Sequence, residues 1–275
     1  MSEDALKFSA LVTGAGRGIG KRLAVGLASR GARVGLVARS KAELDLCHLE
    51  IEHQGGNSLR IRADVADYEQ MAAAVERVRV QFGSPVQVLV CAAATLGPLG
   101  RFSESNPKAW SEVIQTNLMG VMNVCRAVLP HMIQRRSGKI IVLIQSATPL
   151  GRPGMAVYAG SKAALVGFVE SVSEELRDHN IQINCIVPGA SYTHMTDQIL
   201  SAGERAGWRE HEDAMQTRIT GGVPASKQIS LVTFLASDAS NHISGRLLHV
   251  EDDWKKLREG SLRPESFTLR RAQKS

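Results

Sequence analysis

Aromatic side chains are scarce in this chain: phenylalanine, tryptophan and tyrosine together make up 4% of its 275 residues. Hydrophobic residues still reach 44%, so aliphatic side chains must fill most of the core. No apolar run approaches the roughly 18 residues that a membrane-spanning helix needs, and the first residues, MSEDALKF, lack the pattern of a signal peptide. We therefore expect a soluble, cytoplasmic protein with no membrane partner.

Cysteine is rare and scattered, at Cys47, Cys91, Cys125 and Cys185. The separations match neither a metal-binding pattern nor a disulfide framework. The nearest approach to a metal site is Cys47 with His48 and His53, and no second cluster would complete four ligands. The sequence therefore predicts no metal and no disulfide.

A concentrated basic patch is also missing, although the formal net charge is +6. Lysine and arginine are interleaved with acidic residues, and nothing resembles a nucleic-acid-binding module. We expect no nucleic-acid partner. An anionic cofactor or substrate accounts for part of the positive charge.

Short apolar runs alternate with segments of helical periodicity through the first 190 residues. Apolar strands joined by helices indicate a parallel sheet covered on both faces. Right-handed crossovers then give an α/β fold with a doubly wound, Rossmann-type sheet. The expected strands are Ala10–Val12, Arg33–Val37, Ser58–Arg62, Val86–Val90, Lys139–Ile144, Gln182–Val187 and Arg246–Val250. The expected helices include Lys41–Ile51, Tyr68–Phe82, Trp110–Gln134, Val157–His179 and Ser226–Ala236.

We expect a single catalytic domain over residues 1–250, followed by a polar tail over residues 251–275. Residues 195–222 break the alternation of strands and helices. They are polar, contain glycine and follow a strand end, which is typical of a segment that covers a substrate. The sequence therefore predicts a lid in this region.

A glycine-rich turn, TGAGRGIG at residues 13–20, follows the first expected strand. Backbone N–H groups and the helix dipole at such a turn favour a pyrophosphate, and glycines allow its close approach. The spacing is Gly14-x-x-x-Gly18-x-Gly20, because position 19 is Ile. The turn indicates a dinucleotide site, with a tight turn that binds no ligand as the alternative.

The second expected strand lacks the acidic residue that usually binds the ribose of NAD about 20 residues after the glycine turn. Ala38 and Arg39 occupy that region, and Arg17 lies within the turn itself. Two guanidinium groups suit a 2′-phosphate. The pattern favours NADP over NAD, unless both arginines merely face solvent.

Tyr158 and Lys162 stand four residues apart in an expected helix, and therefore on one face of it. A cation beside a tyrosine favours the phenolate and lowers a pKa that is ordinarily about 10. Such a tyrosine could act as an acid or base near neutral pH. The pair gains its meaning from the glycine turn upstream.

Over roughly residues 8–250 the chain resembles the classical short-chain dehydrogenases/reductases. The family's nucleotide signature matches Thr13 to Gly20, and its active-site signature matches Tyr158 and Lys162. Its downstream Asn…Pro-Gly-x-x-x-Thr element matches Asn184, Pro188, Gly189 and Thr193.

The resemblance implies roles for individual residues. Tyr158 would exchange a proton with the carbonyl or alcohol, and Lys162 would lower the pKa of the tyrosine and bind the nicotinamide ribose. Asn117 would hold a water in a proton relay. The implied cofactor contacts are Gly14, Arg17, Gly18, Ile19, Gly20, Arg39, Asp64, Val65, Ala93, Tyr158, Lys162, Pro188, Gly189 and Thr193.

Two departures from the family pattern stand out. The segment after the fourth strand, normally Asn-Asn-Ala-Gly, is Cys91 to Ala94. The catalytic serine normally lies 13 residues before the tyrosine, where this chain has Gln145, whereas Ser146 lies 12 before. Ser146 would reach the carbonyl if the strand bulged by one residue. Gln145 is the alternative, because its amide could donate a hydrogen bond to an oxyanion.

These observations predict an NADP-dependent oxidoreductase that interconverts a small carbonyl substrate and a secondary alcohol, with Asn117, Ser146, Tyr158 and Lys162 as its catalytic residues. The alternative is a catalytically weak protein that senses NADP(H) or serves as a scaffold. The resemblance also implies a homodimer or homotetramer.

Overall fold

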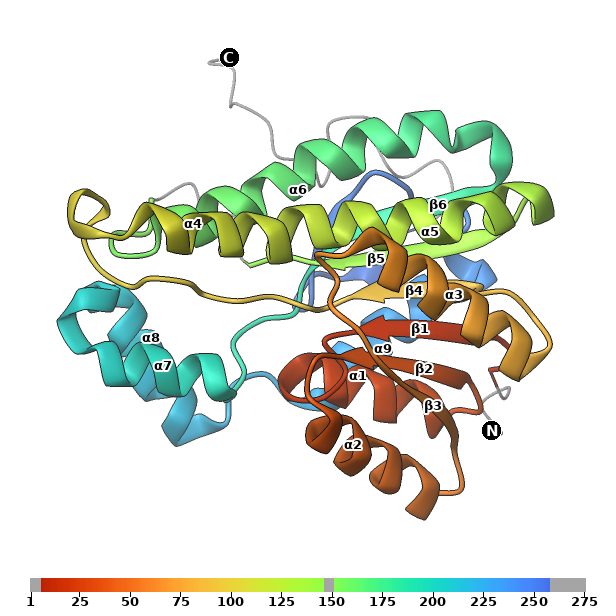
Figure 1. Ribbon diagram of the computed structural model, residues 1–275, viewed down its shortest axis with the longest axis horizontal. Coiled ribbons are helices and arrows are strands. Elements are labelled where there is room, and N and C mark those ends of the chain that lie inside the picture. Colours follow the sequence, from red (N-terminus) through yellow and green to blue (C-terminus); the bar gives the residue numbers. More distant parts are fainter. Residues whose placement is uncertain (1–5, 146–150, 258–275) are drawn as a thin grey trace.

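The computed structural model describes residues 6–145 and 151–257. Within them, seven parallel strands form one sheet in the order β3-β2-β1-β4-β5-β6-β7, with helices on both faces (Figure 1). The strands are β1 (Ser9–Thr13), β2 (Arg33–Ala38), β3 (Asn57–Arg62), β4 (Val88–Cys91), β5 (Gly138–Leu143), β6 (Ile181–Val187) and β7 (Leu247–His249). The predicted doubly wound, Rossmann-type sheet is confirmed.

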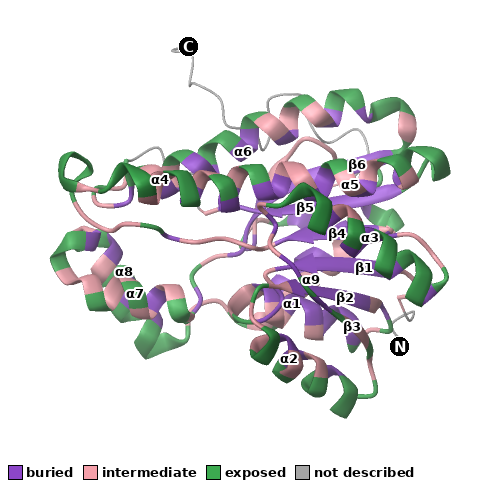
Figure 2. Cartoon of the chain, in the orientation of Figure 1, coloured by how far each residue is buried: buried purple, intermediate pink, exposed green. Residues whose placement is uncertain are grey.

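Two hydrophobic layers hold the helices against the sheet, and the central strands between them are buried (Figure 2). One layer contains α1 (Gly18–Ala28), α2 (Lys41–His53) and α9 (Ala225–Leu235), and the other contains α3 (Tyr68–Phe82), α5 (Gly120–Arg135) and α6 (Ala156–Glu175). Successive strand residues enter opposite layers, as Ile141 and Val142 of β5 do. Aliphatic side chains make up most of both layers.

The helix predicted over residues 110–134 is interrupted. A short helix, α4 (Pro107–Ile114), runs into a π-helical turn at Gln115–Met119 before α5 begins. Such turns insert one residue into the helical repeat and often mark functional positions. Asn117 lies in this turn.

The segment predicted to form a lid is mostly helical. It contains α7 (His194–Ala202) and α8 (Trp208–Thr220), which lie beyond the carboxyl ends of the strands (Figure 1). The sequence did not reveal α8 because this helix buries only Glu210, Ala214 and Thr217. A polar helix of this kind lacks the apolar stripe from which helices are usually predicted.

None of the helices within residues 6–145 and 151–257 has the length and apolar character needed to cross a bilayer. The four cysteines are all described, buried and free.

Candidate functional site

The turn after β1 needs its glycines because backbone segments approach one another closely there. Gly14 has a φ of +69°, and a Cβ on it would lie 2.7 Å from the backbone nitrogen of Ala93. A Cβ on Gly20 would lie 2.2 Å from the carbonyl oxygen of Gly14. No side chain of the described residues caps the N-terminus of α1. The N–H groups of its first turn are therefore available to a pyrophosphate.

A cleft of about 340 Å³ opens beside this turn, along the carboxyl ends of the strands. Most of the residues nominated from the sequence line it: Gly14, Arg17, Gly18, Ile19, Gly20, Arg39, Asp64, Val65, Ala93, Tyr158, Lys162, Pro188 and Thr193. Gly189 and Asn117 are described but lie outside the lining. Ser146 lies outside the described residues.

The cleft also has lining residues that the sequence analysis did not nominate. Among them are Ser40, Glu43, Thr95, Thr116, His194 and Gln198. Ser40, Thr95 and His194 come shortly after the ends of β2, β4 and β6. Because ligands of open α/β sheets bind at the carboxyl ends of the strands, that position was a usable signal for all three.

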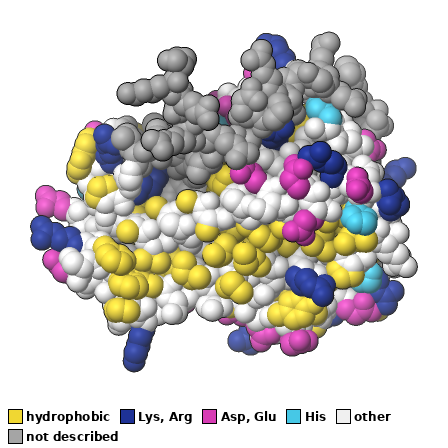
Figure 3. All heavy atoms as spheres, turned by 90° about the horizontal axis from the view of Figure 1, so that it is seen from above, with side chains coloured by type: hydrophobic (Ala, Val, Ile, Leu, Met, Phe, Trp, Pro, Cys, Tyr) yellow, Lys and Arg dark blue, Asp and Glu magenta, His cyan; other side chains and the backbone are white. Residues whose placement is uncertain are grey.

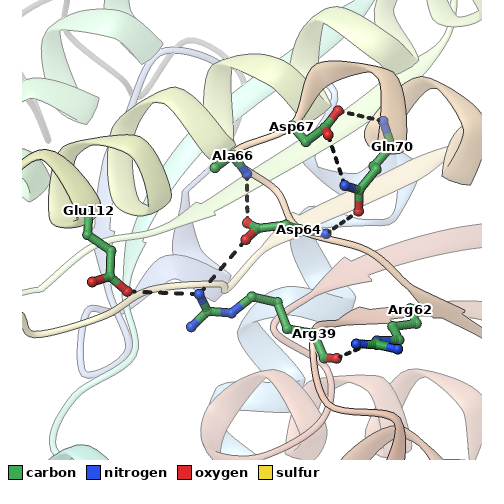
Figure 4. A network of polar contacts seen from close by, with 7 residues as sticks. All are labelled: Arg39, Arg62, Asp64, Ala66, Asp67, Gln70 and Glu112. Atoms are coloured by element: carbon green, nitrogen blue, oxygen red, sulfur yellow. Dashed lines mark hydrogen bonds and ion pairs between the residues drawn. The ribbon is translucent and has the colours of Figure 1, made fainter.

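Opposite charges meet at one end of the cleft (Figure 4). The Nη1 atom of Arg39 lies 3.9 Å from Asp64 Oδ2 and 3.9 Å from Glu112 Oε1. Arg17 Nη1 lies 3.4 Å from Glu43 Oε1. The two arginine side chains are 58% and 59% exposed. Such exposed pairs contribute little stability, so either guanidinium can exchange its carboxylate for another anion.

Asp64 is fixed by a local network at the start of α3 (Figure 4). Its Oδ1 accepts a hydrogen bond from the N–H of Ala66 at 3.0 Å, and its own N–H donates to Gln70 Oε1 at 2.9 Å. Gln70 in turn donates to Asp67, the N-cap of α3, at 2.8 Å. The loop after β3 therefore holds Asp64 and Val65 at the cleft.

Tyr158 and Lys162 lie one turn apart on α6, and both are largely buried where they line the cleft. Lys162 Nζ donates to the carbonyl oxygen of Leu143 at 2.9 Å. Burial lowers the pKa of Lys162 to about 8 and raises the pKa of Tyr158 to about 12. Arg152, which the sequence analysis did not nominate, is a cation that opposes this rise in the tyrosine pKa. The predicted effect of Lys162 on the tyrosine stays a prediction.

The side chain of Asn117 is already engaged in hydrogen bonds. Its Oδ1 accepts from the N–H of Thr95 at 2.8 Å, while its Nδ2 donates to the carbonyl of Thr95 at 2.9 Å and to Ser161 Oγ at 3.0 Å. These bonds fasten the π turn to the loop after β4 and to α6. The water-holding role of Asn117 stays a prediction.

The end of β5 bears on the identity of the catalytic polar group. Gly138 to Leu143 pair one-to-one with Ile181 to Ile186, and Ile144 N–H continues the pattern by donating to Ile186 O at 2.9 Å. The strand therefore has no bulge through Ile144. Gln145 follows directly, and its Oε1 is buried without a hydrogen-bond partner among the described residues. The role of Ser146 stays a prediction.

The segment after β6 joins the cleft to α7. Gly189 has a φ of +73°, and Pro188 accepts a hydrogen bond from Gln228 Nε2 at 2.8 Å. Thr193 forms a capping box with Thr196 at the start of α7. The cofactor contact expected of Gly189 stays a prediction, because this residue lies outside the lining.

Comparison with known proteins places this geometry in context. A model of the family described as short chain dehydrogenase matches residues 9–203. The chain is 35% identical over 251 residues to a 3-oxoacyl-[acyl-carrier-protein] reductase, FabG, of Staphylococcus aureus, covering 88% of this chain and 96% of the relative.

Solved structures with the same fold include proteins with either nicotinamide cofactor. A variant of actinorhodin polyketide ketoreductase with NADPH superposes with a TM-score of 0.80 at 29% identity, over 88% of this chain and 95% of that one. An NAD⁺-bound xylitol dehydrogenase gives 0.79 at 26% identity, over 89% and 98%. The fold by itself therefore does not select between the two cofactors.

Proposed function

Because the chain belongs to the short-chain dehydrogenase family, and is therefore an oxidoreductase with a nucleotide cofactor, we propose that it uses NADP(H) to interconvert a ketone and a secondary alcohol. The observation that carries this proposal is the placement of Tyr158 and Lys162 in the same cleft as the glycine turn. Tyr158 and Lys162 could act on a substrate beside the cofactor only if both side chains lay in the cleft that holds the cofactor.

The cleft suits a dinucleotide because Gly14, Gly18 and Gly20 line it beside the N-terminus of α1, which the N-cap side chain leaves uncapped. Gly14, Gly18 and the N-terminus of α1 would hold the pyrophosphate. Asp64 and Val65 would contact the adenine. When bound, the cofactor supplies or accepts the hydride.

The chain's own contribution is orientation and proton transfer. During reduction, the Tyr158 hydroxyl gives its proton to the substrate oxygen as negative charge develops there. Lys162 stabilises the phenolate that this transfer leaves behind and holds the nicotinamide ribose. Burial of both side chains excludes water and strengthens these electrostatic effects.

The choice of NADP rests on charge at the end of the cleft where Arg17 and Arg39 lie. Both guanidinium groups line the cleft and are largely exposed. A 2′-phosphate would offer them a stronger partner than Glu43 or Glu112, because a phosphate monoester carries more negative charge than a carboxylate.

An apolar cluster reaches the cleft at Tyr158 and Met195, which both line it. Leu96, Met155 and Tyr158 form a buried cluster, against which Leu99, Met195 and Ile199 pack. Relatives of the chain include proteins named for reducing a 3-oxoacyl group. We therefore propose a ketone with an apolar or acyl substituent as the substrate class.

Turnover with purified protein tests the proposal. We expect NADPH to be oxidised in the presence of a 3-oxoacyl thioester or a small apolar ketone. Tyr158→Phe should lower kcat by a factor of about 100 or more while the Kd for NADPH stays within about twofold. Tight NADPH binding with no reduction across a panel of such ketones would contradict the proposal and favour a sensor or scaffold.

We propose that copies of this chain associate through α5 and α6. The outward face of α6 carries small exposed residues, Gly160, Ala163, Ala164 and Gly167, and α5 with its preceding turn exposes Met119 and Ile133. Apolar side chains form a band on the face viewed in Figure 3. A flat apolar helical layer of this kind suits a homodimer, or a homotetramer built from dimers.

A further inference from the structure

A largely buried ion pair joins the segment before α6 to α8. Arg152 Nη1 lies 2.5 Å from Glu210 Oε1, and the two side chains are 15% and 10% exposed. Removing two charges from water costs several kcal/mol per ion, and their mutual attraction offsets this cost only with close geometry. In the other ion pairs between described residues, at least one side chain is 43% exposed or more.

The backbone around this pair is closely packed. A Cβ on Gly154 would lie 2.4 Å from the carbonyl oxygen of Arg205, and a Cβ on Gly207 would lie 2.5 Å from that of Pro153. The carbonyl of Gly154 also accepts a hydrogen bond from the N–H of Gly100 at 3.0 Å. The entry into α6 is thus fixed between the start of α8 and the loop after β4.

The charges of both Arg152 and Glu210 act on Tyr158. The tyrosine is 7% exposed and shares an apolar cluster with Met155, whose N–H donates to the carbonyl oxygen of Arg152 at 3.1 Å. Burial raises the pKa of Tyr158, the Arg152 cation lowers it, and the Glu210 carboxylate raises it. In so dry a site, water screens these two opposing charges only weakly.

Other charged groups near the tyrosine have different partners. Lys162 on α6 donates to the Leu143 carbonyl, and His194 of α7 lines the cofactor cleft. On α8, Asp213 contributes to the raised pKa of Glu210, which burial raises most and Arg152 lowers. The Arg152–Glu210 pair therefore exerts an electrostatic effect on Tyr158 that depends on the position of α8, because α8 carries Glu210.

We propose that Arg152 and Glu210 are positioning residues that couple the placement of α8 to the acid–base strength of Tyr158. The inference rests on the proposed role of Tyr158 as the proton donor. With α8 in place, Glu210 balances Arg152. Displacement of α8 would leave the Arg152 cation unopposed and would favour the phenolate. Closure over a substrate would restore the phenol that reduction requires.

Opposite shifts in a pH profile test this coupling. In the oxidative direction kcat/KM rises with pH as the tyrosine loses its proton. Arg152→Met should move this rise to higher pH and Glu210→Gln should move it to lower pH, each by about half a unit or more. The double variant, in which neither charge remains, should lie between them. Arg79→Met and Glu76→Gln, which break an exposed pair on α3, serve as controls and should leave the profile in place.

A purely structural role would give a different result. Both single variants would then lose activity or stability with an unmoved profile, or would shift it in the same direction, and either outcome overturns the inference. If Arg152→Met does not fold, Arg152→Lys and Glu210→Gln carry the test: the lysine variant should keep the profile and the glutamine variant should shift it. Full activity of Tyr158→Phe would instead refute the proposed function. Failure of the coupling proposal can therefore be distinguished from failure of the proposed function.

Discussion

Arg39 lies in the region where NAD-binding proteins of this fold usually carry an acid, and together with Arg17 it favours NADP. Its guanidinium is shared between Asp64 and Glu112 at 3.9 Å each. Neither contact is close enough for a hydrogen bond, so neither carboxylate occupies the donors of the arginine.

Replacing Arg39 by leucine should therefore affect the two cofactors unequally. We expect the Kd for NADPH to rise about tenfold, or about 1.4 kcal/mol, while the Kd for NADH stays within about twofold. Fluorescence titration of both cofactors provides the measurement. Arg60→Leu, which removes an arginine paired with Asp45, is the matched control. A tenfold preference of the unchanged protein for NADH would contradict the assignment.

Lys162 is a residue whose proposed catalytic role comes at a cost to the stability of the fold. Its folded-state pKa of about 8 lies below its ordinary value of 10.5 because burial disfavours the ammonium. The resulting cost to folding is complete below about pH 8 and disappears as the pH rises past the unfolded value.

Lys162→Met should abolish turnover but stabilise the fold at pH 7, by about 1–3 kcal/mol. The gain should shrink between pH 8 and pH 10.5. Urea unfolding of both proteins at several pH values provides the measurement. A variant that is less stable than the parent at pH 7 would show that the hydrogen bond to Leu143 outweighs the burial cost.

At the scale of elements, the turn between β1 and α1 shows how much a short motif can specify. Gly14 and Gly20 lie where a Cβ would collide with backbone, whereas phosphate binding by the turn stays a prediction. The sequence could not reveal the π turn around Asn117, because one inserted residue hardly disturbs an apolar helical pattern. It also could not reveal α8, which is polar on nearly every side.

Gly20→Ala should disrupt this element. The new Cβ would lie 2.2 Å from the Gly14 carbonyl, so the turn must shift, and we expect NADPH binding to weaken by more than about tenfold with a loss of about 2 kcal/mol in stability. Lys21→Ala, at the next position of α1, should bind NADPH normally. Unchanged binding by the glycine variant would show that the turn does not hold the pyrophosphate.

At the scale of the whole molecule, the outward layer of α5 and α6 has no covering element among the described residues. The exposed apolar and small side chains there (Figure 3) resemble an interface more than a solvated surface. Tyr158 and Lys162 are buried in the same turns of α6 that expose Gly160, Ala163 and Ala164, so assembly would also restrain the helix that carries Tyr158.

Gly167→Arg should disrupt this assembly, because it places a long cation on the outward face of α6, where a Cβ meets no atom within 4 Å. Light scattering coupled to gel filtration should show a dimer or tetramer for the parent and a smaller species for the variant. Val80→Arg, at a 67% exposed position on α3, should leave the mass unchanged. A monomeric parent would contradict the proposed interface.

The sequence by itself determined the parallel sheet, the glycine turn and the membership in the short-chain dehydrogenase family. Those features depend on local composition and spacing, which a linear chain displays directly. Only the tertiary structure decided which charges meet. Arg39 with Glu112, and Arg152 with Glu210, are separated by 73 and 58 positions along the chain. Such pairs depend on how the elements pack, and no local pattern encodes that packing.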